Sequence, residues 1–216
     1  MEEVRRKRRV NPRFVILCTA LAALTACAVG GLWWWFHRGL PGEDVVLPTY
    51  VRQDLLPENR WSRPGLPLED IDGVVIHYVG NPGTSAEANR NYFASLSSGE
   101  ADTFASSHFI VGLEGEVVQC VPLTEWAYAS NGRNGDTVSV EVCHPDDTGE
   151  FLPVTEDRAV ELTAFLCHTF QLEPEEDVIR HYDVTGKVCP KYYVDHPEAW
   201  EDFLDRVSAV LASMEE

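Results

Sequence analysis

Basic residues are scarce in most of this 216-residue chain. Seven of the 17 Lys and Arg lie in the first 38 residues, so the remainder carries 10 basic against 33 acidic residues. A surface with this excess of negative charge repels nucleic acid phosphates and anionic lipid headgroups. The composition therefore argues against nucleic acid as a partner, and we expect the folded part to recognise its ligand by shape.

Charged residues are absent from the 22 positions between Val15 and Phe36. At about 1.5 Å per residue, a helix of this length crosses a hydrocarbon layer of roughly 30 Å. Basic residues precede the run and three tryptophans at 33–35 end it, which predicts a cytoplasmic N-terminus. We expect a cytoplasmic basic tail at 1–14, a single-pass anchor in the cell membrane at 15–36, and an extracytoplasmic remainder.

A cleaved secretory signal and a lipoprotein signal are the alternatives for this segment. Leu24-Thr25-Ala26-Cys27 resembles a lipoprotein cleavage site. The apolar run continues for nine residues beyond Cys27, where a processed protein normally becomes polar. The length of the run favours an uncleaved anchor.

Residues 37–69 lack a sustained hydrophobic period. Five prolines punctuate them, at 41, 48, 57, 64 and 67. This composition is typical of a semi-extended spacer. We expect residues 70–216 to form one domain, since their number suits a single core.

Strand and helix patterns follow one another through residues 70–216. Apolar or alternating runs predict strands at 73–78, 108–111, 116–121, 137–144 and 178–180. Helices are predicted from Ser85 to Leu96, from a cap at Thr155, and from Pro197 onward, with an irregular segment at 182–195. This order predicts an α/β fold, with a mixed central sheet flanked by helices and preceded by one transmembrane helix.

Two histidines end predicted strands, His77 and His181, and Cys189 follows the second by eight residues. Strand ends at one rim of a sheet often bind ligands. Zinc prefers nitrogen and sulfur donors, and a catalytic zinc site offers three protein ligands and one open position. The residue types indicate a zinc site, although their spacing alone also fits ordinary polar residues at strand ends.

Several short motifs occur in order along the chain. They are Ile76-His77-Tyr78 with Asn81, Asn91-Tyr92-Phe93, Ser107-His108-Phe109, Val138-Ser139-Val140-Glu141, and His181-Tyr182-Asp183 followed by Lys187-Val188-Cys189-Pro190. Together they resemble the N-acetylmuramoyl-L-alanine amidases of the type-2 amidase family, which includes phage T7 lysozyme and, more distantly, the peptidoglycan recognition proteins. The resemblance covers about Ile71 to Val207.

The resemblance implies a zinc amidase fold in which His77, His181 and Cys189 hold one zinc ion. The substrate would be bacterial peptidoglycan, cut between N-acetylmuramic acid and the L-alanine of the stem peptide. Such an amide has a poor electrophilic carbon and a poor leaving amine. Zinc would polarise the carbonyl and lower the pKa of its bound water, while a base would carry the water proton to the amine.

Glu141 and Lys187 are the candidate catalytic residues. The alternation of its strand sends Glu141 to the face opposite the valines, and similar family members carry a glutamate here. Lys187 matches a lysine that assists catalysis in T7-like members, and its cation could stabilise an oxyanion. A solvated strand carboxylate and an exposed loop lysine are the simpler interpretations of these two residues.

The chain departs from the family pattern at two motifs. Ser107 stands where T7-like members carry a catalytic tyrosine, which makes Glu141 more necessary as a base. Ala127-Tyr128-Ala129 replaces Ala-Trp-His, so a histidine that could touch the substrate is absent. The candidate substrate-binding residues are Asn81, Arg133 and Asn134.

The remaining histidines and cysteines carry no assigned chemistry. We expect His108 to be structural, because the three-ligand set is complete without it. Cys120 and Cys143 could form a disulfide with each other or remain buried thiols. The pairing of Cys167 is also open.

The sequence thus predicts a monomeric, zinc-dependent peptidoglycan amidase. A non-catalytic module of the same fold that binds muropeptides is the alternative, and a metal-dependent hydrolase of other amides is a third. The complete donor set, with a carboxylate and a lysine, favours the enzyme, because a binding module needs none of them.

Overall fold

The computed structural model of the protein describes residues 24–27, 29–30 and 39–214. Residues from Leu40 onward form one unit and the preceding residues another. The predicted basic tail lies outside the described residues, and so does the predicted anchor except for 24–27 and 29–30. None of the helices in the described part of the chain is long and apolar enough to span a membrane.

Strands in the unit that begins at Leu40 pair into one six-stranded sheet of order β1-β4-β3-β5-β2-β6. They are β1 (Val51–Gln53), β2 (Val74–Tyr78), β3 (Phe109–Val111), β4 (Val117–Gln119), β5 (Val138–Val142) and β6 (Val178–Arg180). β3 and β4 are antiparallel, whereas β2 is parallel to both β5 and β6, and β5 to β3. The predicted mixed α/β fold is confirmed.

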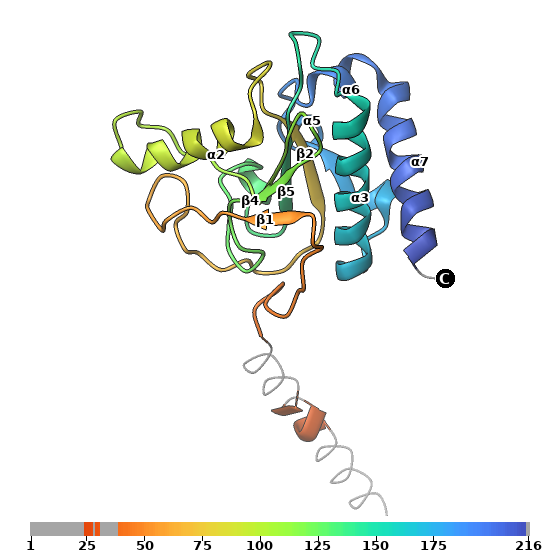
Figure 1. The fold of residues 1–216 in the computed structure, drawn as a ribbon. Helices are drawn as coiled ribbons and strands as arrows, with labels where there is room; N and C mark the ends of the chain where they lie inside the picture. The colour runs from red at the N-terminus through yellow and green to blue at the C-terminus, as the bar shows by residue number, and fades with distance from the viewer. Residues whose placement is uncertain (1–23, 28, 31–38, 215–216) are drawn as a thin grey trace, which may run out of the picture. The chain divides into compact units, whose positions relative to one another are not determined.

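Helices cover both faces of this sheet (Figure 1). They are α2 (Ala86–Ser95), α3 (Pro153–Phe170), α4 (Pro174–Asp177), α5 (His181–Thr185), α6 (Lys191–Asp195) and α7 (Pro197–Met214). α3 and α7 pack side by side over the larger core, and α2 contributes to the smaller core on the opposite face. As predicted, the Ser85 hydroxyl caps α2, by accepting the N–H of Ala88, and α7 begins at Pro197.

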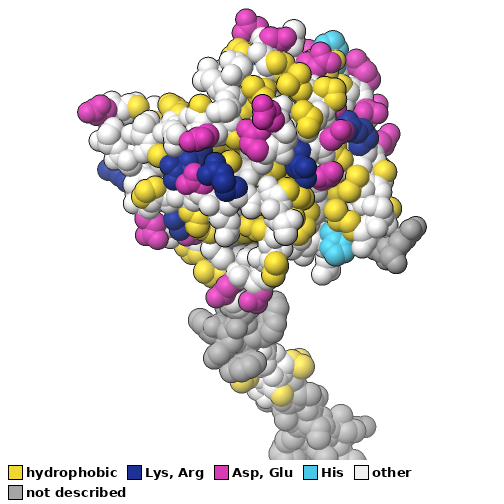
Figure 2. Space-filling view, viewed as in Figure 1, with side chains coloured by type: hydrophobic (Ala, Val, Ile, Leu, Met, Phe, Trp, Pro, Cys, Tyr) yellow, Lys and Arg dark blue, Asp and Glu magenta, His cyan; other side chains and the backbone are white. Residues whose placement is uncertain are grey.

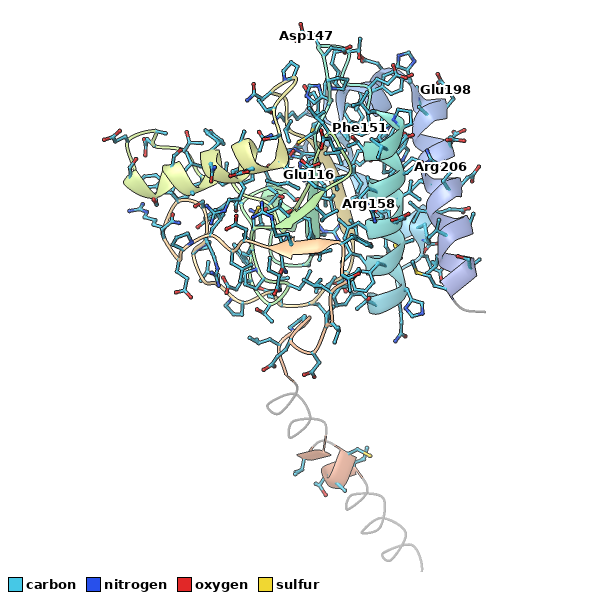
Figure 3. The ribbon with its side chains drawn as sticks, in the orientation of Figure 1. Glu116, Asp147, Phe151, Arg158, Glu198 and Arg206 are labelled. Carbon is cyan, nitrogen blue, oxygen red and sulfur yellow. The ribbon has the colours of Figure 1, made fainter. Side chains whose placement is uncertain are left out.

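Ion pairs link the two long helices at the surface. Arg206 of α7, labelled in Figure 3, donates to Glu156 at 2.7 Å and also to Asp157, both on α3. Tyr193 from α6 donates to the other oxygen of Glu156 at 2.6 Å. This carboxylate therefore ties α6 and α7 to α3 at the margin of the larger core.

Strand alternation decides which side chains reach each core. The three valines of β5 and Ile76 of β2 belong to the larger core under α3 and α7. The next residues along each strand, His77 and Glu141, point to the other face. His77 is the register partner of Glu141 in the parallel β2–β5 pair, so the sheet itself places the two side chains next to each other.

Residues 40–69, where the sequence predicts a spacer, pack on the domain. β1 pairs with β4 at the edge of the sheet, and the N–H of Leu56 donates to the carbonyl of Cys120 at 2.8 Å. Leu56 is completely buried in the smaller core, and Trp61 packs against that core. The prolines interrupt any helical or strand period, which is why composition alone suggests an extended linker.

Two local predictions differ from the structure. α3 begins at Pro153 with Leu152 at the cap, and the Thr155 hydroxyl donates to the carbonyl of Leu113 instead of capping. Residues 182–195, predicted to be irregular, contain most of α5 and all of α6. Helices of five residues are too short to show a hydrophobic period, so the pattern could not predict them.

The charge excess is visible on the surface. On the face shown in Figure 2, acidic side chains are spread around the domain, whereas Lys and Arg are fewer and gather across its middle. Several basic groups of the domain are paired with carboxylates, among them Arg63 with Glu125 and Arg90 with Asp54. Such pairing leaves little free positive charge for a polyanion.

Replacing Leu56 with Ala tests whether residues 40–69 belong to the folded domain. We expect Leu56→Ala to lower the free energy of unfolding by about 2–4 kcal/mol, because the side chain is completely buried. Leu66, which is 44% exposed, is the matched control, and Leu66→Ala should cost less than about 0.5 kcal/mol. Urea unfolding followed by tryptophan fluorescence measures both, and equally small losses would contradict the packing.

Candidate metal and active site

A cavity of about 620 Å³ opens at the carboxyl ends of β2 and β5. All five residues predicted to bind the metal or to act in catalysis line it: His77, Glu141, His181, Lys187 and Cys189. They come from separate parts of the chain, and parallel pairing brings β2, β5 and β6 to a common edge. The structure thus gathers the predicted catalytic and metal-binding residues in one place.

The three potential metal ligands lie at defined positions in the fold. His77 lies in β2, and His181 is the first residue of α5, immediately after β6. Cys189 lies between α5 and α6, and its carbonyl accepts the N–H of Tyr182 at 2.8 Å. That hydrogen bond folds the segment back, so the Cys189 thiol lies near His181 at the start of α5.

The donor atoms of His77, His181 and Cys189 lie within 4.8 Å of one another. In particular, Cys189 Sγ is 3.8 Å from His77 Nδ1. A tetrahedral zinc ion with bonds of about 2.0–2.3 Å needs donors roughly 3.3–3.8 Å apart. His181 Nδ1 is buried and has no hydrogen-bond partner, which is costly unless a ligand completes it. One donor pair already has this spacing, so the three residues, which form the cluster of this kind in the described part of the chain, suit a metal ion such as zinc.

Burial holds both imidazoles neutral. It lowers the pKa of His77 well below the usual value, and His181 and Lys187 lower it further. Burial, followed by the charge of Lys187, also lowers the pKa of His181. A neutral imidazole keeps a lone pair for a metal at physiological pH.

Burial acts in the opposite direction on the two acidic groups. It raises the pKa of the Cys189 thiol to about 12, and the nearby carboxyl of Glu141 raises it further. It raises the pKa of Glu141 to about 8, against which the charge of Lys187 acts. Oε2 of Glu141 is buried without a partner. Both groups therefore favour their protonated forms when no cation is bound.

Lys187 and Ser107 differ sharply in their access to the cavity. Lys187 is exposed and lines the cavity, and its charge acts on His77, His181, Glu141 and Cys189. Ser107 is completely buried, and its hydroxyl donates to the carbonyl of Phe109. Ser107, which stands where T7-like members carry a tyrosine, thus makes its hydrogen bond in the interior and does not line the cavity.

The candidate substrate-binding residues take different positions. Asn134 lines the cavity, but its Oδ1 accepts the N–H groups of Ala129 and Ser130 at 3.1 and 2.6 Å. Arg133 is paired with Asp136 at 2.8 Å, and neither Arg133 nor Asn81 is among the cavity-lining residues. The geometry therefore gives Asn134 a role in shaping its loop.

Pattern analysis did not identify two polar residues that touch the histidines. Ser130 Oγ lies 3.2 Å from Nε2 of His77, and Asn131 Oδ1 lies 3.2 Å from Nε2 of His181. Both belong to a stretch rich in Asn and Gly, which predicts only a loop. The one available signal was the position of this loop immediately before the strand of Glu141.

His108 and the other cysteines have structural surroundings. Nδ1 of His108 accepts the N–H of Ser139 at 3.0 Å, and Nε2 is 2.8 Å from the carbonyl of Glu125. Both ring nitrogens are engaged, as expected for a structural histidine. Cys120, Cys143 and Cys167 are buried free thiols, and Cys189 is also free, which leaves its sulfur available.

The pKa of Glu141 predicts a pH dependence of stability in the metal-free protein. Because folding raises this pKa from 4.5 to about 8, the stabilisation it brings is complete below pH 4.5 and is lost as the pH rises through 8. Glu141→Gln stays neutral at every pH. With a chelator present, we expect wild type and Glu141→Gln to be similar at pH 5, and wild type to be less stable by a few kcal/mol at pH 9. A difference between them that does not change with pH, measured by urea unfolding, would contradict this account.

Known relatives share this sequence pattern. A family model described as N-acetylmuramoyl-L-alanine amidase matches residues 67–192. The amidase BlyA of Bacillus subtilis (strain 168) is 33% identical over 177 residues, covering 73% of this chain and 46% of BlyA. A probable N-acetylmuramoyl-L-alanine amidase of Bacillus licheniformis is 34% identical over 173 residues, covering 74% of this chain and 48% of the relative. The chain thus spans about half the length of the curated relatives it matches.

Solved structures share the fold of this chain. The catalytic domain of XlyA superposes with a TM-score of 0.61 at 24% identity, covering 73% of this chain and 98% of that one. A mutant endolysin from Bacillus subtilis has a TM-score of 0.61 at 26% identity, with coverages of 73% and 97%. Since the family model matches more than half of its residues, the chain belongs to the N-acetylmuramoyl-L-alanine amidase family Amidase_2, as its motifs predicted.

Proposed function

We propose that the protein is a zinc-dependent amidase that hydrolyses the bond between N-acetylmuramic acid and L-alanine in peptidoglycan. The observation that carries the proposal is the convergence of His77, His181 and Cys189 in one cavity, beside Glu141. The family match and the amidase relatives support the choice of substrate.

His77, His181 and Cys189 are the proposed zinc ligands. Two neutral imidazoles and one thiol supply three donors, which is the number that a catalytic zinc site takes from the protein. Zinc bound there would polarise the scissile carbonyl and make a water molecule more acidic. The buried position of the donors keeps bulk water from competing with them.

Glu141 is the proposed general base and acid. Its register position beside His77 puts the carboxyl within the cavity, on the same face as the ligands. Burial raises the pKa of this carboxyl to about 8 in the metal-free site, and a bound cation would favour the ionised form that accepts a proton. Glu141 takes a proton from the attacking water and returns it to the departing amine.

Lys187 is the proposed electrostatic partner of the reacting carbonyl. Its exposed ammonium lines the cavity and is free to approach a bound substrate. Negative charge develops on the carbonyl oxygen as water attacks, and a nearby cation lowers the energy of that state. With Ser107 buried elsewhere, the proposed chemistry uses Glu141 for proton transfer and Lys187 for charge stabilisation.

A muropeptide-binding module of the same fold is the second candidate function. The buried Oε2 of Glu141 argues against it, because a desolvated carboxyl oxygen without a hydrogen-bond partner is costly and brings no advantage to simple binding. A hydrolase of other amides would share the site but would leave peptidoglycan intact.

Product analysis separates these functions. Incubated with purified peptidoglycan, the zinc-loaded protein should release new N-terminal alanine without new reducing sugar ends. Metal analysis should find about one zinc per chain, since the described residues contain one three-donor set. A binding module would sediment with peptidoglycan and release nothing, and a hydrolase of other amides would cut only small acyl amides.

Two variants test the assigned roles in the same assay. Cys189→Ala should lose both zinc and product, because only two donors remain. Glu141→Gln should keep the zinc and lose at least about 100-fold in turnover, the usual size of a general acid–base contribution. Wild-type turnover by Glu141→Gln would assign the proton transfer to another residue.

We further propose that the chain acts as a monomer on the outer side of the cell membrane, anchored by residues 15–36. The charge-free run of 22 residues and the basic residues before it support the anchor. The full-length protein should sediment with membranes and be released by detergent but not by alkaline washing. Cys27→Ser should behave identically, and loss of attachment in that variant would favour a lipoprotein signal.

A further inference from the structure

The loop from Ala129 to Asn134 lies against both histidines of the proposed zinc site. Ser130 Oγ and Asn131 Oδ1 each lie 3.2 Å from an imidazole nitrogen, on His77 and His181 respectively. In both rings the contacted atom is Nε2. Nδ1 of His77 faces the sulfur of Cys189, and Nδ1 of His181 has no partner.

We propose that Ser130 and Asn131 are positioning residues that orient the two histidines, so that Nδ1 of each ring points to the metal. This inference rests on the proposed zinc site and adds two residues that take no part in the proton transfers.

Hydrogen bonding explains how these residues would select one ring state. A neutral imidazole carries a hydrogen on one nitrogen and a lone pair on the other. An amide oxygen can only accept, so Nε2 of His181 donates to Asn131 and the lone pair stays on Nδ1. The Ser130 hydroxyl can accept from Nε2 of His77 in the same way. Each contact thus fixes both the tautomer and the plane of the ring.

The loop that carries these groups is itself held in place. Asn134 Oδ1 accepts two backbone N–H groups, and the N–H of Asn134 donates to the carbonyl of Asn131 at 3.2 Å. Asn131 adopts a φ of +50°, in the left-handed region. Glycine adopts this conformation with less strain, so the backbone alone gives no reason for an asparagine side chain here.

A direct contact with substrate is the competing explanation for Asn131, since the residue also lines the cavity. The two explanations differ when no substrate is present. A residue that only contacts substrate leaves the affinity for zinc unchanged, whereas a residue that orients a ligand changes it. Groups that orient histidine ligands are typically worth 10–100-fold in metal affinity.

The test is the zinc dissociation constant of the full-length protein, measured without substrate by competition with a chromophoric chelator. We expect Asn131→Gly to bind zinc about 10–100-fold more weakly and to change the absorption spectrum of the Co²⁺-loaded protein. Ser130→Ala should weaken binding in the same direction. Asn131→Asp should keep wild-type affinity, because its carboxylate accepts the same hydrogen bond.

Asp102→Gly is the matched control. Asp102 also has a positive φ, of +46°, but it is exposed and does not line the cavity. This variant should bind zinc as wild type does. Asn131→Gly should unfold, when metal-free, at or above the wild-type temperature, which would show that its loss of affinity is not a loss of fold.

Wild-type affinity and an unchanged Co²⁺ spectrum in Asn131→Gly would overturn the inference while leaving the zinc site in place. The same would follow if Asn131→Asp lost as much affinity as Asn131→Gly. Failure of the wild-type protein to bind zinc at all would overturn the proposed function together with the inference.

Discussion

Parallel pairing of β2 with β5 and with β6 is the constraint on which the site depends. Ile76 pairs with Val140 on one side and with Arg180 on the other, so the carboxyl ends of the three strands meet at one edge. A slip of one residue in β5 would turn Glu141 into the core under α3 and α7 and expose a valine to the cavity. The apolar faces of the strands therefore determine the register. The register in turn determines which side chains of β5 face the cavity.

Burial favours the neutral forms of the site residues when no metal is bound. It disfavours the imidazolium of His77, the thiolate of Cys189 and the carboxylate of Glu141, all in the same cavity. A divalent cation held by the three donors would favour both anions, so binding would couple the ionisation of a ligand to that of the base.

The sequence predicted the central features of the fold because they follow local rules. Buried strands such as β2 and β5 show as apolar or alternating runs, and the motifs that carry His77, His181 and Cys189 placed the chain in its family. The packing of Leu56 was not predictable, because an isolated apolar residue among prolines has no period. The contacts of Ser130 and Asn131 were also missed, since they depend on where a loop folds over two strands, which composition does not encode.

The central claim is that two histidines and one cysteine share a single metal ion. X-ray absorption spectroscopy of the zinc-loaded protein tests this most directly. The account predicts one sulfur neighbour at about 2.3 Å and two imidazole nitrogens at about 2.0–2.1 Å. A zinc shell of only oxygen and nitrogen, without sulfur, would show that Cys189 is not a ligand and would contradict the account.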